Sequence, residues 1–349
     1  MDDAPIQRVP RDDLDQQRQA IGPNKPPGKA SLPASHKTFM KTTPPLTGVL
    51  PVLQYPVRTD GGLNVSALRR EIDFVFAFGC AGVTLAMVSE ITRLTLVDRL
   101  ALLEEVVSHV AGRGPVVCSV VAESSAQVME LAKGALDRGA SALLAALPLT
   151  YRVEPAQQES FFRAILEAVP LPLILQDSSG YLGFPLSMDV QLRLFSDFPG
   201  RVLFKPESVP VGPVISRMMQ ETAGEAVIFD GTGGKFLREN FQRGVKGVLP
   251  GADTPWAVQC LWRALNEGDM KAAVEIQKAL LPIFIGMSSL DSYLAAEKFF
   301  LRIQGIFENE ALLPPASYSI DEIARRNLLD ALHDLARLCN HSTTHWKHT

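Results

Sequence analysis

Long apolar runs are missing from this sequence of 349 residues. A membrane-spanning helix needs about 20 consecutive apolar residues, and because no run reaches that length we expect no membrane association. The start of the chain also lacks the apolar core of a signal peptide, which favours a cytoplasmic location. The four cysteines are scattered without CxxC spacing, so we expect reduced thiols and neither disulfides nor zinc ligands.

Positive charge is not in excess either. The formal net charge is −4 at pH 7, whereas a nucleic-acid-binding protein usually carries a basic stripe. We therefore expect no nucleic-acid partner. The composition, with 46% hydrophobic and 21% charged residues, is that of an ordinary globular protein.

Residues 1–44 differ in composition from the rest of the chain. Eight of the 25 prolines lie in this segment or directly after it, among Asp, Arg, Gln and Lys. Such a segment buries too little apolar surface to offset the entropy lost on ordering. We expect a flexible arm, and its acidic residues argue against a mitochondrial transit peptide.

From Thr47 onward, short β-rich runs alternate with amphipathic helical patterns. Nearly continuous Val, Ile, Leu and Ala is typical of parallel strands that are covered on both faces. Eight alternations predict a (β/α)₈ TIM barrel over residues 45–267, and an open doubly wound sheet is the alternative. The expected strands are Thr47–Leu53, Gly82–Ala86, Pro115–Val120, Ala142–Leu147, Leu173–Gln176, Val202–Lys205, Ala226–Phe229 and Gly247–Leu249.

Helix signals lie between the strands and continue beyond them. Thr95 with Asp98 predicts a capped helix start, and Arg138 with Gly139 predicts a helix end. After Thr254 the pattern is helical, and its first helix is needed to close the barrel. The others predict appended C-terminal helices over residues 268–340, followed by a frayed tail at 341–349.

The active site of a TIM barrel lies at the carboxyl ends of its strands. No histidine is expected there, which argues against a histidine-based triad or metal site. Clustered carboxylates that hold Mg²⁺ are the alternative to a site without metal. The polar residues expected at the strand ends are Ser89, Glu90, Thr150, Tyr151, Gln176, Asp177, Lys205, Glu207, Asp230, Thr232 and Asp253.

Lys205 ends the apolar run Val-Leu-Phe-Lys, so its side chain is expected to point into the barrel mouth. A lysine that loses hydration has a lowered pKa, and its neutral amine can attack a carbonyl without any cofactor. Glu207, two residues on, is expected on the same side, as a general base or as an ion-pair partner. The alternative for Lys205 is a structural ion pair at the rim.

A glycine-rich turn follows the seventh expected strand. Asp230, Gly231 and Thr232 begin it, and its backbone N–H groups could bind an anion, as loops at this place in TIM barrels often do. A tight turn between strand and helix is the alternative.

These residues form a pattern that resembles the dihydrodipicolinate synthase / N-acetylneuraminate lyase superfamily of class I aldolases, from about Thr47 to Ile306. The resemblance implies that Lys205 forms a Schiff base with a small 2-keto acid. It also implies a homo-oligomer, a tetramer or a dimer. The matching residues are Gly48, Pro51, Gly82, Ser89, Glu90, Leu94, Thr95, Asp98, Arg99, Pro148, Lys205, Gly244, Gly247 and Pro255.

Other positions depart from the family pattern. The two threonines that hold the substrate carboxylate fall on Met87 and Val88, where only backbone N–H groups are left to bind it. The tyrosine on strand five falls on Gln176, which cannot act as an acid or base. The tyrosine pair after strand four becomes Leu149-Thr150-Tyr151.

Gln176-Asp177 is similar to the 2-keto-3-deoxy-L-arabonate dehydratase branch, which shares Ser89-Glu90, Phe204-Lys205-Pro206-Glu207 and Asp230-Gly231. This resemblance implies a lyase acting on a 2-keto-3-deoxy sugar acid. Lys205 would form the imine, Glu207 would take the C3 proton, and Gln176 and Ser89 would position the substrate. Dehydration and C–C cleavage both stay open. The alternatives are a pyruvate aldolase of the dihydrodipicolinate synthase or N-acetylneuraminate lyase type, and a catalytically silent ligand-binding barrel.

Overall fold

The computed structural model describes residues 46–285 and 287–347, which belong to one compact unit. The predicted arm at 1–44 lies outside the described residues. In the described part, no helix is long and apolar enough to cross a membrane. The tail is expected to be frayed, but it is packed against the protein as far as Lys347. Trp346 is 5% exposed, and the Lys347 N–H donates to the Ile303 carbonyl at 2.7 Å.

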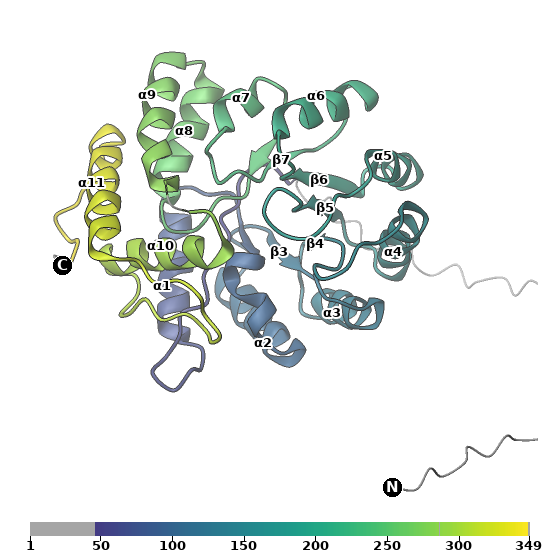
Figure 1. Ribbon diagram of the computed structural model, residues 1–349, viewed down its shortest axis with the longest axis horizontal. Coiled ribbons are helices and arrows are strands. Elements are labelled where there is room, and N and C mark those ends of the chain that lie inside the picture. The colour runs from purple at the N-terminus through teal and green to yellow at the C-terminus, as the bar shows by residue number, and fades with distance from the viewer. Residues whose placement is uncertain (1–45, 286, 348–349) are drawn as a thin grey trace, which may run out of the picture. The chain divides into compact units, whose positions relative to one another are not determined.

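Eight parallel strands form a closed barrel in this part of the chain (Figure 1). β2 to β6 pair in sequence order, and β1, β8 and β7 form the remaining arc. Single bridges, Val52 with Thr84 and Phe204 with Ile228, join the two sets. The strands are β1 Gly48–Val49, β2 Val83–Leu85, β3 Val116–Ser119, β4 Ala142–Ala145, β5 Leu173–Asp177, β6 Val202–Pro206, β7 Phe229–Asp230 and β8 Gly247–Val248. The closed barrel is therefore confirmed, and the open sheet is not formed.

Helices surround the barrel on its outside (Figure 1). The Thr95 hydroxyl accepts the Asp98 N–H at 3.2 Å at the start of α2, as the sequence predicts. α3 ends before Arg138, and Gly139 follows with φ of +82°. The outer helices are α1 Val65–Ala77, α2 Leu96–Val110, α3 Ser125–Asp137, α4 Pro155–Ala168, α5 Met188–Asp197, α6 Val211–Glu221, α7 Leu237–Phe241 and α8 Pro255–Glu267.

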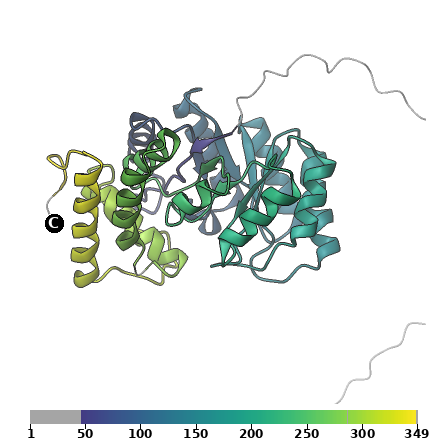
Figure 2. The same cartoon turned by 90° about the horizontal axis from the view of Figure 1, so that it is seen from above.

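Further helices lie on one side of the barrel (Figure 2). α9 packs against α8 and α11, whereas α10 contacts the short helix η3 beside the barrel mouth. Through α10, the C-terminal segment therefore reaches the carboxyl end of β2, which η3 follows. Its helices are α9 Met270–Leu280, α10 Leu290–Ile303 and α11 Glu322–Leu338, with the short helix η5 at Leu281–Phe284; η3 Met87–Ser89 and η4 Ile91–Arg93 follow β2.

The barrel interior is an apolar core of alternate strand residues. Ile174 and Leu203 point inward, whereas Leu173 and Phe204 pack outward against the helices. Because side chains alternate along a strand, Gln176 and Lys205 also point inward, one step closer to the carboxyl end. The interior cluster includes Leu50, Val52, Val117, Leu144, Ile174, Leu203, Phe229 and Leu249.

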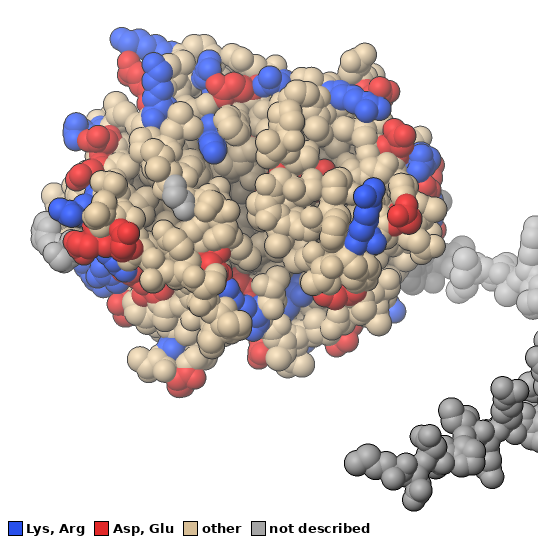
Figure 3. Space-filling model, in the orientation of Figure 1, with Lys and Arg blue, Asp and Glu red and all other residues tan. Residues whose placement is uncertain are grey.

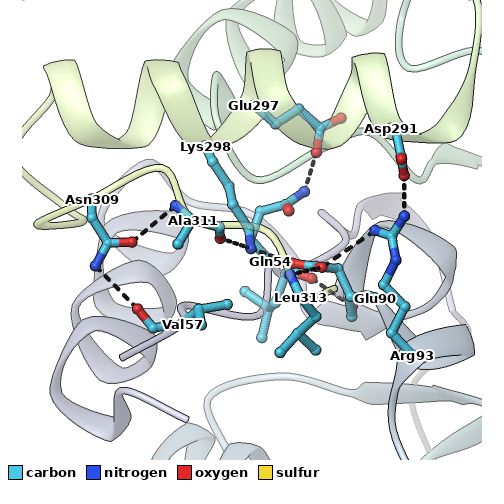
Figure 4. A network of polar contacts seen from close by, with 12 residues as sticks. Gln54, Val57, Glu90, Arg93, Asp291, Glu297, Lys298, Asn309, Ala311 and Leu313 are labelled. Atoms are coloured by element: carbon cyan, nitrogen blue, oxygen red, sulfur yellow. Dashed lines mark hydrogen bonds and ion pairs between the residues drawn. The ribbon is translucent and has the colours of Figure 1, made fainter. Parts of the chain in front are cut away.

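A buried polar network, which we call the α10 network, joins α10 to the barrel (Figure 4). The Lys298 ammonium pairs with Glu90 and also donates to the Ala311 carbonyl at 2.7 Å. The Leu313 N–H donates to Glu90 at 2.7 Å, and Arg93 bridges Glu90 and Asp291. Removal of one partner from a buried ion pair leaves a charge without compensation.

Lys298→Met is therefore expected to lower the free energy of unfolding by about 3–5 kcal/mol. Lys298 is 1% exposed, so water cannot replace it as the partner of Glu90. Urea denaturation measures the loss. Lys278→Met, on the exposed face of α9, is the matched control and should change stability by no more than about 0.5 kcal/mol. Equal losses in the two variants would contradict this role of the network.

Candidate active site

Lys205 lies at the carboxyl end of β6, and its side chain is 5% exposed. Its ammonium nitrogen is 2.7 Å from Oε1 of Glu207. On β5, Gln176 pairs in register with Lys205 and donates from Nε2 to Glu207 Oε2 at 2.5 Å. The three side chains therefore form one connected group at the barrel mouth, as their sequence positions predict.

Glu207 is tightly packed, and its surroundings change its pKa. Gly231 makes room for it, because a Cβ at Gly231 would lie 2.3 Å from Glu207 Cγ. Burial raises the pKa of Glu207 above its usual value, while Lys205 and Gln176 act in the opposite direction. A carboxylate whose pKa is raised by burial is a stronger base than an exposed one.

Tyr181 completes the group, although the sequence did not single it out. Its hydroxyl is 3.5 Å from Glu207 Oε2 and 3.3 Å from Gln176 Nε2. Tyr181 is 42% exposed as a whole, but its hydroxyl end lies against Glu207 and Gln176. Desolvation there raises the pKa of Tyr181, with the nearby Glu207 as the second cause. Tyr181 comes from the loop between β5 and α5, and a phenol with a raised pKa stays protonated and can donate to Glu207.

Gly180, next to Tyr181, sets the path of this loop, but the sequence alone does not show that it does so. A Cβ at Gly180 would lie 2.0 Å from the backbone carbonyl oxygen of Glu207. Only glycine lets this loop pass so close to the end of β6. The Tyr181 hydroxyl, on the next residue, lies beside the Glu207 carboxylate.

A cavity of about 630 Å³ opens around this group. Met87 and Val88 of η3 line it, and so do Gly231 and Thr232 after β7. α10 adds Tyr293 and Glu297, which the sequence did not predict because this helix was assigned to an appended element. Burial, and then Asp253 and Glu71, raise the pKa of Glu297, and Gln54 donates from its Nε2 to the Glu297 carboxyl group.

Asp230 shapes the turn after β7. Its carboxylate is fully buried and accepts from the Thr232 hydroxyl and from Asn240 Nδ2, each at 2.9 Å. Burial raises the pKa of Asp230 despite these bonds. These contacts favour the tight-turn interpretation of this segment over anion binding by its first residues.

Ser89 and Glu90 do not line the cavity. The Ser89 hydroxyl donates to the Leu53 carbonyl and accepts the Ala86 N–H at 3.1 Å. Glu90 belongs to the α10 network, and its backbone is left-handed with φ of 55°. The expectation that these side chains contact substrate is corrected, because backbone groups and Lys298 already use their polar atoms.

Three other expected contacts also lie outside the cavity lining. The Thr150 hydroxyl donates to Glu123 Oε2 at 2.6 Å, and the Tyr151 hydroxyl donates to the Glu123 carbonyl at 2.7 Å. Asp177 accepts the Ser179 N–H at 3.2 Å. These side chains hold the loops after β4 and β5 in place, so we correct their assignment as substrate contacts. Among the described residues, no group of three or more His, Cys, Asp or Glu is arranged to hold a metal ion.

A closed barrel with a buried lysine at the end of β6 and helices beyond α8 defines a class of lyases. Residues 45–334 match the model of the Dihydrodipicolinate synthetase family, and the chain belongs to this family. It is therefore a lyase built on a TIM barrel.

Individual relatives agree on the family and differ in substrate. The chain is 30% identical over 244 residues to a 4-hydroxy-tetrahydrodipicolinate synthase of Neisseria gonorrhoeae, covering 68% of this chain and 82% of the relative. It is 26% identical over 275 residues to the L-2-keto-3-deoxyarabonate dehydratase of Azospirillum brasilense, covering 77% and 88%. The solved dihydrodipicolinate synthase of Rhodopseudomonas palustris matches with a TM-score of 0.76 at 26% identity, covering 84% of this chain and 99% of that one.

Proposed function

We propose that the protein forms a Schiff base between Lys205 and the carbonyl of a small 2-keto acid, a 2-keto-3-deoxy sugar acid. The supporting observation is the contact of the Lys205 amine with a buried carboxylate inside a cavity large enough for such a substrate. Glu207 can take a proton from the ammonium and leave a nucleophilic amine. The relative named L-2-keto-3-deoxyarabonate dehydratase supports this substrate class.

The proposed reaction starts with attack of the neutral Lys205 amine on the keto carbon. Glu207 then returns the proton that it took from the ammonium to the former keto oxygen, which leaves as water, so that an iminium ion and a free carboxylate remain. The iminium ion withdraws electrons, so Glu207 can remove a proton from C3 and leave an enamine. The enamine electron pair then expels the C4 hydroxyl group, which leaves as water after it gains a proton. Tyr181 contacts Glu207 and is placed to pass the proton from Glu207 to the leaving C4 hydroxyl group. Gln176 holds the Glu207 carboxylate in position.

A second candidate is aldol cleavage or condensation with pyruvate. The relative named 4-hydroxy-tetrahydrodipicolinate synthase favours it, and it uses the same imine at Lys205. The two reactions differ in the bond that breaks next to the imine. Either way, we also propose a homo-oligomer, a tetramer or a dimer, in the cytoplasm.

Borohydride trapping tests the shared step. The protein is incubated with pyruvate or with a 2-keto-3-deoxypentonate, reduced with borohydride and weighed by mass spectrometry. We expect one covalent adduct per chain, which peptide mapping places on Lys205. Without reduction, elimination gives a product lighter by one water, whereas cleavage gives pyruvate and an aldehyde. Absence of an adduct across a panel of 2-keto acids would favour a silent ligand-binding barrel.

A further inference from the structure

The cavity is larger than the proposed substrate requires. A 2-keto-3-deoxypentonate has about ten non-hydrogen atoms and fills less than about 300 Å³, even if each takes the volume of a water molecule. The cavity measures about 630 Å³. Beyond the barrel mouth it continues between the start of α6, at Val209–Pro213, and the residues of and around α7 from Lys235 to Arg243.

Two cations line this outer part. Lys235 and Arg243 are both partly buried, and neither forms an ion pair with a residue that the structure describes. Arg243 is held by its bond to the Glu239 carbonyl at 2.7 Å and lies against Gly212, where a Cβ would come within 3.0 Å of its guanidinium carbon. The Lys235 ammonium lies 5.5 Å from the centre of the Phe236 ring.

Glu239 is the one described acidic residue that lines this outer part, and its charge is already balanced. Its Oε1 pairs with Arg238 at 2.5 Å, and its Oε2 accepts from Gln277 Nε2 at 2.6 Å. It therefore does not neutralise Lys235 and Arg243. Figure 3 looks onto this face, where blue side chains stand over α7 and α8 beside a hollow surrounded mostly by uncharged residues.

The start of α6 adds to the positive potential. Pro210 caps it without a side-chain hydrogen bond, and the first turn holds no acidic residue. The N–H groups at a helix start carry partial positive charge and attract anions. Because Pro210 and Pro213 have no N–H, Val211 and Gly212 supply these groups here. Two cations and a helix start therefore face the same part of the cavity.

We propose that this outer part binds an anionic group, a carboxylate or a phosphate, at the end of the substrate far from the keto acid. Lys235 and Arg243 contact the anion, and the start of α6 supports them. The inference rests on the proposed function, since it assigns the substrate class of the same cavity: 2-keto-3-deoxy acids with a second anionic end.

The test compares three matched substrates: a 2-keto-3-deoxy aldonate with a neutral end, the corresponding aldarate with a terminal carboxylate, and the aldonate with a terminal phosphate. We expect kcat/KM about 10–100-fold higher for one anionic substrate than for the neutral one, the size of one or two charge-assisted hydrogen bonds. Whichever anionic substrate, the carboxylate or the phosphate, has the higher kcat/KM identifies the anion that the site binds. In Lys235→Gln/Arg243→Gln the preference should fall to about twofold, mainly through a higher KM.

Two controls make the result decisive. Lys246→Gln, an exposed lysine outside the cavity lining, should keep the preference. Pyruvate has no far end, so borohydride trapping with pyruvate should be unchanged in the double variant. No trapping in the unaltered protein overturns the proposed Schiff base, whereas trapping with equal kcat/KM for all three substrates overturns the anion site alone.

Discussion

Replacement of Lys205 by alanine is expected to abolish the borohydride-trapped adduct and to lower kcat by on the order of 10⁴–10⁶-fold, as when a covalent nucleophile is removed. The reason is that the Lys205 nitrogen lies in the cavity, 2.7 Å from Oε1 of the buried Glu207, which can take its proton. Mass spectrometry of the reduced protein and steady-state kinetics measure the two effects. An adduct of unchanged yield in Lys205→Ala would assign the imine to another amine.

A second substitution separates the charge of Lys205 from its nucleophilicity. Lys205→Arg keeps a cation beside Glu207, but a guanidinium group stays protonated and does not form an imine. We expect this variant to fold and to give no adduct. Lys246→Ala, which changes an exposed lysine, should give the adduct in full yield. If Lys205→Arg retained turnover, the ammonium would serve the reaction by its charge alone.

The position of the lysine could be predicted because it depends on short-range pattern and on a rule of the fold. Continuous apolar runs marked the strands, alternation along β5 and β6 set which residues point inward, and TIM barrels place chemistry at the carboxyl ends of strands. Gln176, Lys205 and Glu207 follow from these facts. Their mutual contacts at 2.5 and 2.7 Å agree with that reasoning.

The same rule failed where the partner of a side chain lies far away in the sequence. Ser89 and Glu90 stand at a strand end, but the hydroxyl of Ser89 binds the Leu53 carbonyl and Glu90 pairs with Lys298, 208 residues later. Nothing local in the sequence specifies such partners. The sequence predicted α10 as a helix, yet which of its residues would line the cavity depends on how it packs against the barrel.

Tyr181 shows a different limit. The sequence indicates that a tyrosine is missing at Gln176, but a loop conformation decides whether another phenol takes its place. The close approach of Gly180 to Glu207 is a steric fact of the folded chain. Strand patterns therefore predict the positions of Lys205 and Glu207 at the barrel mouth, and tertiary packing decides what surrounds them.

Glu207→Gln is expected to separate imine formation from proton transfer. The amide keeps the shape of the side chain and can still accept a hydrogen bond from Lys205, but it cannot take the ammonium proton. The adduct should therefore still form with both pyruvate and a 2-keto-3-deoxypentonate, at a lower rate, because solvent must take that proton instead. The amide cannot take the C3 proton either, so kcat should fall by about 10²–10⁴-fold, the usual cost of a lost general base. Single-turnover trapping and steady-state kinetics measure the two steps. Glu225→Gln, an exposed residue, is the matched control with unchanged kcat.

The pH profile gives an independent measure of the same group. The base must be ionised to accept a proton, and burial raises the pKa of Glu207 above the usual value of a glutamate. The rate of the unaltered protein should therefore fall as the pH drops through that raised pKa, earlier than for an exposed glutamate. In Glu207→Gln this acidic limb should be absent from the single-turnover rate of the step that follows imine formation, in which Lys205 no longer has to be deprotonated. An acidic limb that persists unchanged, with kcat retained, would assign the base to another group, and Glu207 would then serve only as the ion-pair partner of Lys205.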